Sequence, residues 1–237
     1  IENGKINYSF DKIKVSEGKE DKRNHGAIDS LARLPFISHL KIVRLQEDGY
    51  TLKAIEDNPA LFGVDEYEEF GIEDPRITQI DSTYYITFVA VSKEMNVCTA
   101  LMSTTDFKNF ERHGIIFPCE NKDVVIHPEK IGDKYMCYHR PVAKCAFSRP
   151  SIATAKSPDL IHWGEHRFFL APSDPPAWDS MRVGSGTPPI RIQEGWLHIY
   201  HGVKQTSPED MTGEYSAGAI LADKNDPNKI LAKSKNP

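Results

Sequence analysis

The chain has 237 residues, of which 39% are hydrophobic, and this is sufficient for one large β domain with a packed core. Its formal net charge of −5 and pI of about 6.0 argue against nucleic-acid binding, because nucleic-acid-binding proteins usually carry basic faces. The apolar runs are short, and none approaches the roughly 20 residues that a membrane-spanning helix needs. We therefore expect one cytoplasmic domain over residues 1–237 that binds neither nucleic acid nor membrane. Homo-oligomerisation is left open.

The cysteines and the chain ends add two further expectations. Cys98, Cys119, Cys137 and Cys145 show no C-x-x-C spacing and no nearby histidine pair, so we predict free thiols and no metal site. The chain starts at Ile1 without an initiator methionine and ends in a loop-like Lys-Ser-Lys-Asn-Pro. It is expected to be part of a longer protein, in which case any targeting segment lies outside this sequence.

The N-terminal segment, residues 1–37, is the hardest part of the domain to interpret. Between Ser16 and Arg33 it is rich in Lys, Glu, Asp and Gly and shows little periodicity. This composition is typical of a loop, or of a damaged first copy of the repeat described below.

Gly71-Ile72-Glu73-Asp74-Pro75-Arg76 places two adjacent carboxylates and an arginine before a β-rich run. That run, residues 77–88, is divided by a turn at Asp81-Ser82. Because proline disfavours the helical region for the residue before it, Asp74 is predicted to enter the strand in an extended conformation. A carboxyl group held in this way suits a general acid. Equally, the hexapeptide alone is compatible with a surface turn in which Arg76 pairs with Glu73.

The same pattern of proline, short strand, turn and aromatic strand recurs twice. It starts at Pro75, Pro128 and Pro188, and we expect the three segments to be equivalent strands around one axis. A further β-rich segment with a charged turn follows each aromatic strand, at residues 99–107, 151–160 and 216–223. Residues 38–49 can be an earlier copy. Repeats of about 50–60 residues with about four short strands each predict an all-β fold, a β-propeller.

An ordered set of motifs resembles glycoside hydrolase family 130, which contains β-mannoside phosphorylases and some β-mannosidases. The resemblance covers about residues 38–233 and implies a five-bladed β-propeller, which can be incomplete at both termini of this chain. The motifs are Gly71–Arg76, Asn121–Asp123, His127–Lys130, His139–Pro141, Trp178–Ile190, Glu194–Trp196, Tyr200–Val203 and Asp226–Pro227.

The resemblance assigns the general acid to Asp74, whose proton would travel through a sugar hydroxyl to the leaving oxygen. Inverting cleavage needs this acid and a nucleophile on the opposite face of the sugar. Glu73 is expected to disfavour ionisation of Asp74, and Arg76 to oppose that effect. Inorganic phosphate is already anionic and needs no base, so it must be held by basic side chains. The resemblance implies that these are Lys122, Arg140, Arg182 and His201.

Each of these four basic residues also has a simpler interpretation. Lys122 can be a solvated surface lysine, and Arg140 can form a structural pair with Glu129. Arg182 can lie along Trp178, and His201 can be a hydrogen-bonded core histidine. The set as a whole, in its order, favours the phosphate site.

Glu73, Arg76 and Tyr138 are expected to contact the substrate. Only Asn24 and Arg33, by rough position, correspond to the early strand that supplies an Asn and an Arg to the sugar in the family.

The function that we expect is inverting phosphorolysis of β-mannosides to α-mannose 1-phosphate. The substrate is a small oligosaccharide, and no cofactor is expected beyond inorganic phosphate as co-substrate. The alternatives are an inverting β-mannosidase of the same fold, in which a glutamate activates water, and a non-catalytic carbohydrate-binding propeller. The linkage and the acceptor sugar depend on loops and are not predicted.

Overall fold

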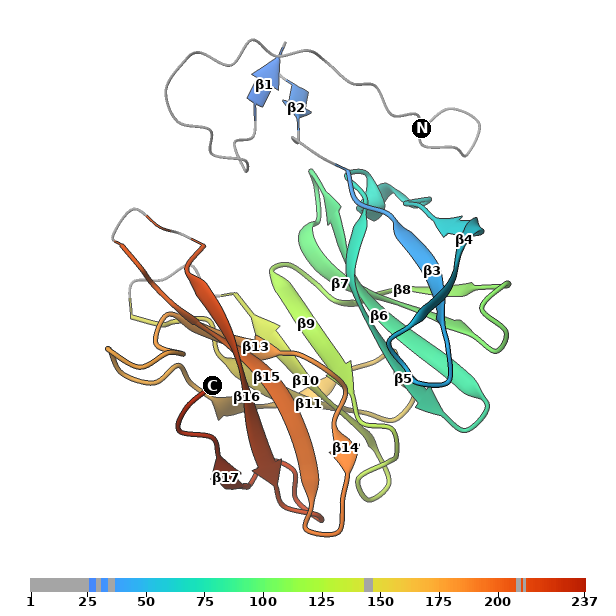
Figure 1. The fold of residues 1–237 in the computed structure, drawn as a ribbon. Coiled ribbons are helices and arrows are strands. Elements are labelled where there is room, and N and C mark those ends of the chain that lie inside the picture. Colours follow the sequence, from blue (N-terminus) through green and yellow to red (C-terminus); the bar gives the residue numbers. More distant parts are fainter. Residues whose placement is uncertain (1–25, 29–30, 34–36, 143–146, 208–209, 211) are drawn as a thin grey trace. The chain divides into compact units, whose positions relative to one another are not determined.

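The computed structural model describes residues 26–28, 31–33, 37–142, 147–207, 210 and 212–237. In these ranges the chain is all-β, with one 3₁₀ turn, η1 (Glu66–Glu68), and no α-helix (Figure 1). Accordingly, no helix in the described ranges is long and apolar enough to cross a membrane. The chain divides into two compact units, Ile1–Glu73 with Ala90–Asn96, and Asp74–Val89 with Val97–Pro237. Most of the segment 1–37, including Asn24, lies outside the described residues, as does Cys145.

The first unit contains two hairpins of paired antiparallel strands. In the first, β1 (Gly26–Ile28) pairs with β2 (Leu31–Arg33), and in the second, β3 (Leu40–Leu45) pairs with β4 (Leu52–Leu61). The turn between β3 and β4 is closed by Asp48, whose Oδ1 accepts hydrogen bonds from the backbone N–H groups of Tyr50 and Thr51. An aspartate that binds backbone donors two or three residues ahead is a common way to close a turn.

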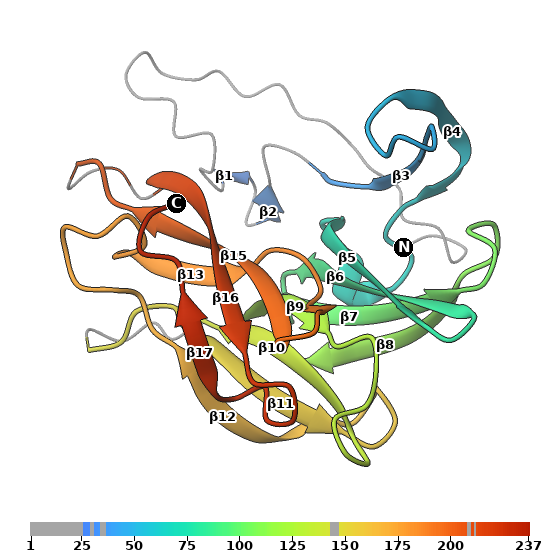
Figure 2. The same ribbon diagram turned by 60° about the horizontal axis from the view of Figure 1, so that its bottom comes forward.

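From Ile72 onward the described chain forms three sheets, which Figures 1 and 2 show as successive blocks of strands. In the first sheet the strands pair in the order β5 (Ile72–Ile80), β6 (Thr83–Ser92), β7 (Asn96–Thr104) and β8 (Glu111–Phe117). The second contains β9 (Asn121–Ile126), β10 (Tyr135–Pro141), β11 (Ile152–Ser157) and β12 (Gly164–Leu170). The third contains β13 (Arg182–Ser185), β15 (Trp196–Lys204), β16 (Glu214–Ala222) and β17 (Ile230–Lys233), and β14 (Ile190–Arg191) also pairs with β15.

The predicted repeat matches these sheets in most of its parts. The aromatic segments form the second strands β6, β10 and β15, and the segments after them form the third strands β7, β11 and β16. The three charged turns share one device, because Asp106, Asp159 and Asp223 each accept hydrogen bonds from two backbone N–H groups just downstream.

The three prolines differ from the predicted pattern. Pro75 lies inside β5, whereas Pro128 follows the end of β9, and Pro188 lies in the gap between β13 and β14. Proline has no N–H to donate to a strand ladder, so it interrupts regular pairing at the two latter places. The segments that begin at the prolines are therefore not equivalent strands, although the aromatic strands after them are.

The second sheet buries both of its faces. Val124 and Ile126 of β9 belong to a cluster with Ile80, Leu101 and other residues of the first sheet. Val125, between them on the strand, belongs to a second cluster with residues of the third sheet such as Val183 and Tyr200. Successive side chains of a strand point to opposite faces, so β9 runs between two apolar layers. Each fully buried large apolar side chain stabilises this arrangement by about 1.5–3 kcal/mol.

Two threonine hydroxyls fix the first sheet against β9. Thr87 Oγ1 donates to the carbonyl of Val124 at 2.6 Å, and Thr78 Oγ1 donates to the carbonyl of Ile126 at 3.1 Å. Both hydrogen bonds are buried. The start of β5 and the start of β9, which carry the charged residues described next, are consequently held close together.

Candidate active site

Two aspartates of this region, Asp74 and Asp123, have left-handed backbone conformations, with φ of 51° and 56°. The extended conformation predicted for Asp74 is therefore wrong. Aspartate tolerates the left-handed region better than most residues, because its short polar side chain can bond locally. At Asp123 the strand also bulges: Arg140 pairs with Lys122 and Tyr138 with Val125, so two residues of β9 face the single intervening residue of β10. Bulges of this kind re-aim side chains and occur often beside active sites.

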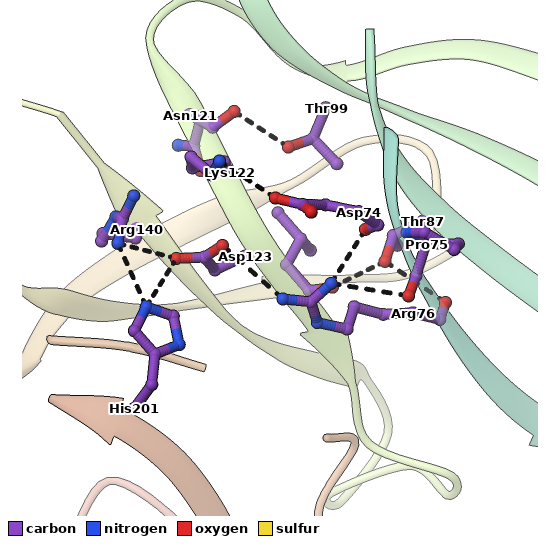
Figure 3. Close-up of polar contacts among 11 residues, drawn as sticks. Asp74, Pro75, Arg76, Thr87, Thr99, Asn121, Lys122, Asp123, Arg140 and His201 are labelled. Atoms are coloured by element: carbon purple, nitrogen blue, oxygen red, sulfur yellow. Dashed lines mark hydrogen bonds and ion pairs between the residues drawn. The ribbon is translucent and has the colours of Figure 1, made fainter. Parts of the chain in front are cut away.

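Asp74 forms an ion pair with Lys122. The Asp74 Oδ2 and Lys122 Nζ atoms face each other (Figure 3) and are 3.0 Å apart. Their side chains are 43% and 25% exposed. Arg76 turns back along its own strand and donates from Nη1 to the Asp74 backbone carbonyl at 3.0 Å. The acid predicted by the family resemblance is thus open to solvent on one side and faces a cation on the other.

The pKa of Asp74 is lowered from its ordinary value. Burial raises it, but the positive charges of Lys122, Arg76 and Arg140 lower it and together outweigh the burial. Glu73 was expected to raise the pKa of Asp74, but the three positive charges decide its direction. Glu73 instead accepts a hydrogen bond from Ser38 Oγ at 3.5 Å within the first unit.

Asp123 is the centre of the remaining charged contacts (Figure 3). Its Oδ2 lies 2.9 Å from Arg140 Nη1 and 3.6 Å from His201 Nε2, and its Oδ1 lies 3.7 Å from Arg76 Nη2. Arg140 Nη1 is also 3.4 Å from His201 Nε2. We refer to these residues together as the site cluster: Asp74, Arg76, Lys122, Asp123, Arg140 and His201. Of the four predicted phosphate contacts, three are therefore brought together here.

Two simpler interpretations of these residues are not supported. Lys122 is paired with Asp74 rather than only solvated. Glu129, the alternative partner of Arg140, forms its ion pair with Arg191 at 2.7 Å.

The surroundings of His201 favour its neutral form. Burial lowers its pKa, and although Asp123 opposes this effect, the charges of Arg140, Arg76 and Lys122 lower it further. In the neutral form Nε2 can accept the hydrogen bond from Arg140 Nη1. His201 is accordingly a polar member of the site cluster and not a third full positive charge around Asp123.

Arg182 reaches the site cluster through an aromatic ring. Its Nη2 donates to the Tyr215 hydroxyl at 2.9 Å and to the carbonyl of Thr212, and its guanidinium lies 5.2 Å from the centre of the Tyr215 ring. The Tyr215 and His201 rings are in turn 5.5 Å apart between centres. Arg182, on β13, thus borders the cluster, and its guanidinium lies over the ring of Tyr215, a residue that the sequence analysis did not single out.

Tyr138 does not belong to this site, and its predicted contact with substrate is not supported. It is fully buried, its hydroxyl donates to the Pro227 carbonyl at 3.0 Å, and its ring stacks on Phe169 with centres 4.5 Å apart. On the β10 strand it faces the apolar layer between the second and third sheets.

The change Tyr138→Phe is expected to lower stability without altering substrate binding. It removes one buried hydrogen bond, which typically contributes about 0.5–1.5 kcal/mol. Denaturant unfolding and the KM for the glycoside measure the two effects. A severalfold rise in the KM for the glycoside, at unchanged stability, would show that Tyr138 contacts the substrate.

Asp123 and Tyr215 were missed by the sequence analysis. Asp123 adjoins Lys122 in the Asn121–Asp123 motif, but its burial between cations follows from the bulge of β9, which the sequence does not reveal. Tyr215 gives no local signal, because its position beside Arg182 and His201 arises from the pairing of β15 with β16.

Within the described residues, no group of three or more His, Cys, Asp or Glu side chains is arranged to hold a metal ion.

The comparisons with known proteins agree on one family. A family model described as beta-1,4-mannooligosaccharide phosphorylase matches residues 37–237. A beta-1,2-mannobiose phosphorylase of Listeria innocua is 41% identical over 231 residues, which are 98% of this chain and 60% of the relative. A 1,2-beta-oligomannan phosphorylase of Thermoanaerobacter sp. is 35% identical over 197 residues, which are 81% of this chain and 61% of the relative.

A solved structure gives the same result. The Listeria innocua beta-1,2-mannobiose phosphorylase in complex with beta-1,2-mannobiose superposes with a TM-score of 0.78 at 40% identity, over 93% of this chain and 62% of that one. The chain thus spans about three fifths of the length of the relatives that it matches.

Proposed function

Because the chain belongs to glycoside hydrolase family 130, we propose that the protein transfers a β-linked mannosyl residue to inorganic phosphate with inversion and releases α-mannose 1-phosphate. The observation that carries this proposal is the site cluster. A partly exposed carboxyl, Asp74, lies 3.0 Å from Lys122 and in the same cluster as Arg140. An acid beside cations is the combination that proton donation and an anionic nucleophile require together.

Phosphate would be held by Lys122 and Arg140, with His201 beside them and Arg182 at the border. Arginine offers a planar fork of donors to phosphate oxygens, and lysine offers a compact charge. Phosphate carries its own negative charge, so the protein needs to orient it and not to deprotonate it. No cofactor takes part in this scheme.

Phosphate also prepares Asp74 for its role as acid. Lys122, Arg76 and Arg140 keep the pKa of Asp74 low, which favours the ionised form. An anion bound to Lys122 and Arg140 offsets these charges and raises the pKa of Asp74 again. In the proposed scheme the carboxyl is therefore protonated most readily when the nucleophile is in place.

The change Lys122→Met is expected to lower stability at neutral pH by about 0.2–1 kcal/mol, the usual contribution of a partly exposed ion pair. The folded-state pKa of Asp74 lies below its unfolded value of about 3.9, so the stabilisation is complete above the unfolded value. It is lost as the pH falls through the folded-state pKa. The difference between the variant and the natural protein should then disappear, which urea unfolding at several pH values measures.

Lys108→Met is the matched control, because Lys108 is exposed on the turn between β7 and β8. It should show no such pH dependence. A stability difference for Lys122→Met that is constant from neutral to acidic pH would contradict the role of the ion pair.

A hydrolase would need a carboxylate that is free to activate water. The carboxylate nearest to Arg140 is Asp123, whose side chain is 2% exposed and which is already paired with that arginine. This arrangement favours the phosphorylase.

The test is incubation of the full-length protein with β-mannobioses with and without phosphate: the proposal predicts mannose 1-phosphate only when phosphate is present. Equal cleavage without phosphate would refute it.

The first substrate to test is β-1,2-mannobiose. The Listeria relative, at 41% identity, is named for this disaccharide, whereas the family description names β-1,4-linked mannooligosaccharides. A kcat/KM that is higher for the β-1,2 linkage than for the β-1,4 linkage would support this assignment.

We further propose that the sheets β5–β8, β9–β12 and β13–β17 are blades of a five-bladed β-propeller. Their four-stranded order and the apolar layers on both faces of the second sheet support this architecture. A crystal structure of the full-length protein with a different number of blades would overturn it.

A further inference from the structure

Asp123 is almost completely enclosed, although it is charged. Its side chain is 2% exposed, while that of Arg140 is 9% exposed and that of Arg76 is 19% exposed. Figure 3 shows Asp123 between these two arginines. Burial of a lone carboxylate is costly, and it is tolerated here because the carboxylate lies between two guanidinium groups. The carboxylate in turn reduces the repulsion between the two guanidinium groups that share it.

The backbone is built to bring this carboxylate to its place. Asp123 has a left-handed conformation at the bulge of β9, which turns its side chain away from the regular alternation of the strand. On the facing strand β13, Gly184 leaves the necessary space. A Cβ atom at Gly184 would collide with Asp123 Oδ2 and would lie 2.6 Å and 2.7 Å from His201 Cε1 and Nε2. The left-handed conformation, the bulge and the glycine therefore all help to place the Asp123 carboxylate beside Arg140 and His201.

We propose that Asp123 is the positioning residue of the phosphate site: it fixes the side chains of Arg140, Arg76 and His201 in the arrangement that receives phosphate. This inference rests on the proposed phosphorolysis and adds a residue to it. Asp123 contacts no substrate in this scheme and acts only through its three partners. Holding the cations in advance removes the need to order them when phosphate binds.

Charge and position predict opposite effects of the change Asp123→Asn. The substitution removes a negative charge beside the bound phosphate, so electrostatics alone would strengthen phosphate binding. If Asp123 positions the cations, Asp123→Asn leaves their side chains less well ordered. Phosphate binding then weakens in spite of the more favourable charge. The sign of the change in phosphate affinity therefore separates the two accounts.

The experiment uses Asp123→Asn in the full-length protein, with KM for phosphate, KM for β-1,2-mannobiose and kcat measured separately. We expect the KM for phosphate to rise on the order of 10-fold or more, since small misplacements of positioning groups cost up to about 100-fold. The KM for the disaccharide should change less than the KM for phosphate, because Arg76, at 3.7 Å, is the one partner of Asp123 that is also expected to contact the sugar. Asp133→Asn, an exposed change on the loop between β9 and β10, controls for net charge.

Gly184→Ala provides a second variant that alters no charge. The added methyl group would displace the Asp123 carboxylate and the His201 ring, so the same selective rise in the KM for phosphate is expected. Gly164→Ala is its control, because a Cβ atom at Gly164 meets nothing within 4 Å. An unchanged or lower KM for phosphate in Asp123→Asn would overturn the inference.

A measurement on the natural protein decides the case if either variant fails to fold. In crystals soaked with phosphate, Asp123 should remain paired with Arg140 while Arg140 contacts the anion. Departure of Arg140 from Asp123 on phosphate binding would overturn the positioning role. Absence of phosphate-dependent cleavage by the natural protein refutes the proposed function instead, so the two failures are distinguishable.

Discussion

Replacing Asp74 by asparagine is expected to lower kcat/KM for the disaccharide by about 10²–10⁴-fold, the contribution of a positioned general acid. The amide cannot supply the proton that the leaving oxygen needs. The fold should remain intact, because the side chain is 43% exposed and its ion-pair partner, Lys122, is itself partly exposed. Initial rates with phosphate, together with a thermal unfolding curve, measure both effects.

The leaving group provides an internal check on this prediction. An aryl β-mannoside with a nitrophenol leaving group needs little protonation, so the loss caused by Asp74→Asn should be much smaller with it. Asp81→Asn is the matched control: Asp81 lies in the turn between β5 and β6 and has a similar left-handed φ of 53°. A variant at Asp74 that cleaves the disaccharide at nearly the natural rate would remove this residue from the role of acid.

Replacing Arg140 by methionine is expected to raise the KM for phosphate and to lower kcat, with a combined loss of about 10²–10³-fold. The guanidinium must hold charge on the attacking anion through the transition state. The substitution also leaves the buried Asp123 carboxylate without its nearest partner, which costs about 3–5 kcal/mol of stability. Steady-state kinetics at varied phosphate and urea unfolding measure the two consequences.

The double variant Arg140→Met with Asp123→Asn separates stability from function. Removing both charges should restore most of the lost stability, because no unpaired buried carboxylate remains. It should not restore phosphate use. Arg191→Met, which breaks the more exposed pair with Glu129, should leave the kinetics unchanged. Recovery of normal phosphorolysis in the double variant would contradict the role of Arg140.

The repeat of aromatic strands could be predicted from the sequence because each strand carries its own local pattern. Apolar and aromatic residues in β6, β10 and β15, and an aspartate in each later turn, are visible without knowledge of the fold. The proline segments were less informative. A proline marks where pairing is interrupted, and the sequence does not reveal whether it lies within the strand, as Pro75 does, or after it, as Pro128 does.

The site was predicted as a set of residues but not as a set of contacts. Lys122, Arg140 and His201 do lie together, yet no sequence pattern indicates that Lys122 pairs with Asp74 or that Asp123 lies between the arginines. Those pairings depend on a bulge in β9 and on the space left by Gly184, which are properties of packed strands. The left-handed φ of Asp74 is a similar case, because Pro75 alone favours an extended residue before it.

The origin of the oxygen that becomes bonded to C1 of mannose tests the central claim most directly. The full-length protein would be incubated with β-1,2-mannobiose and phosphate in ¹⁸O-labelled water, and both sugar products analysed by mass spectrometry and NMR. If the site cluster holds phosphate as the nucleophile, α-mannose 1-phosphate forms with unlabelled oxygen at C1. Labelled free mannose as the main product derived from the cleaved residue would show that water attacks, and would contradict the account.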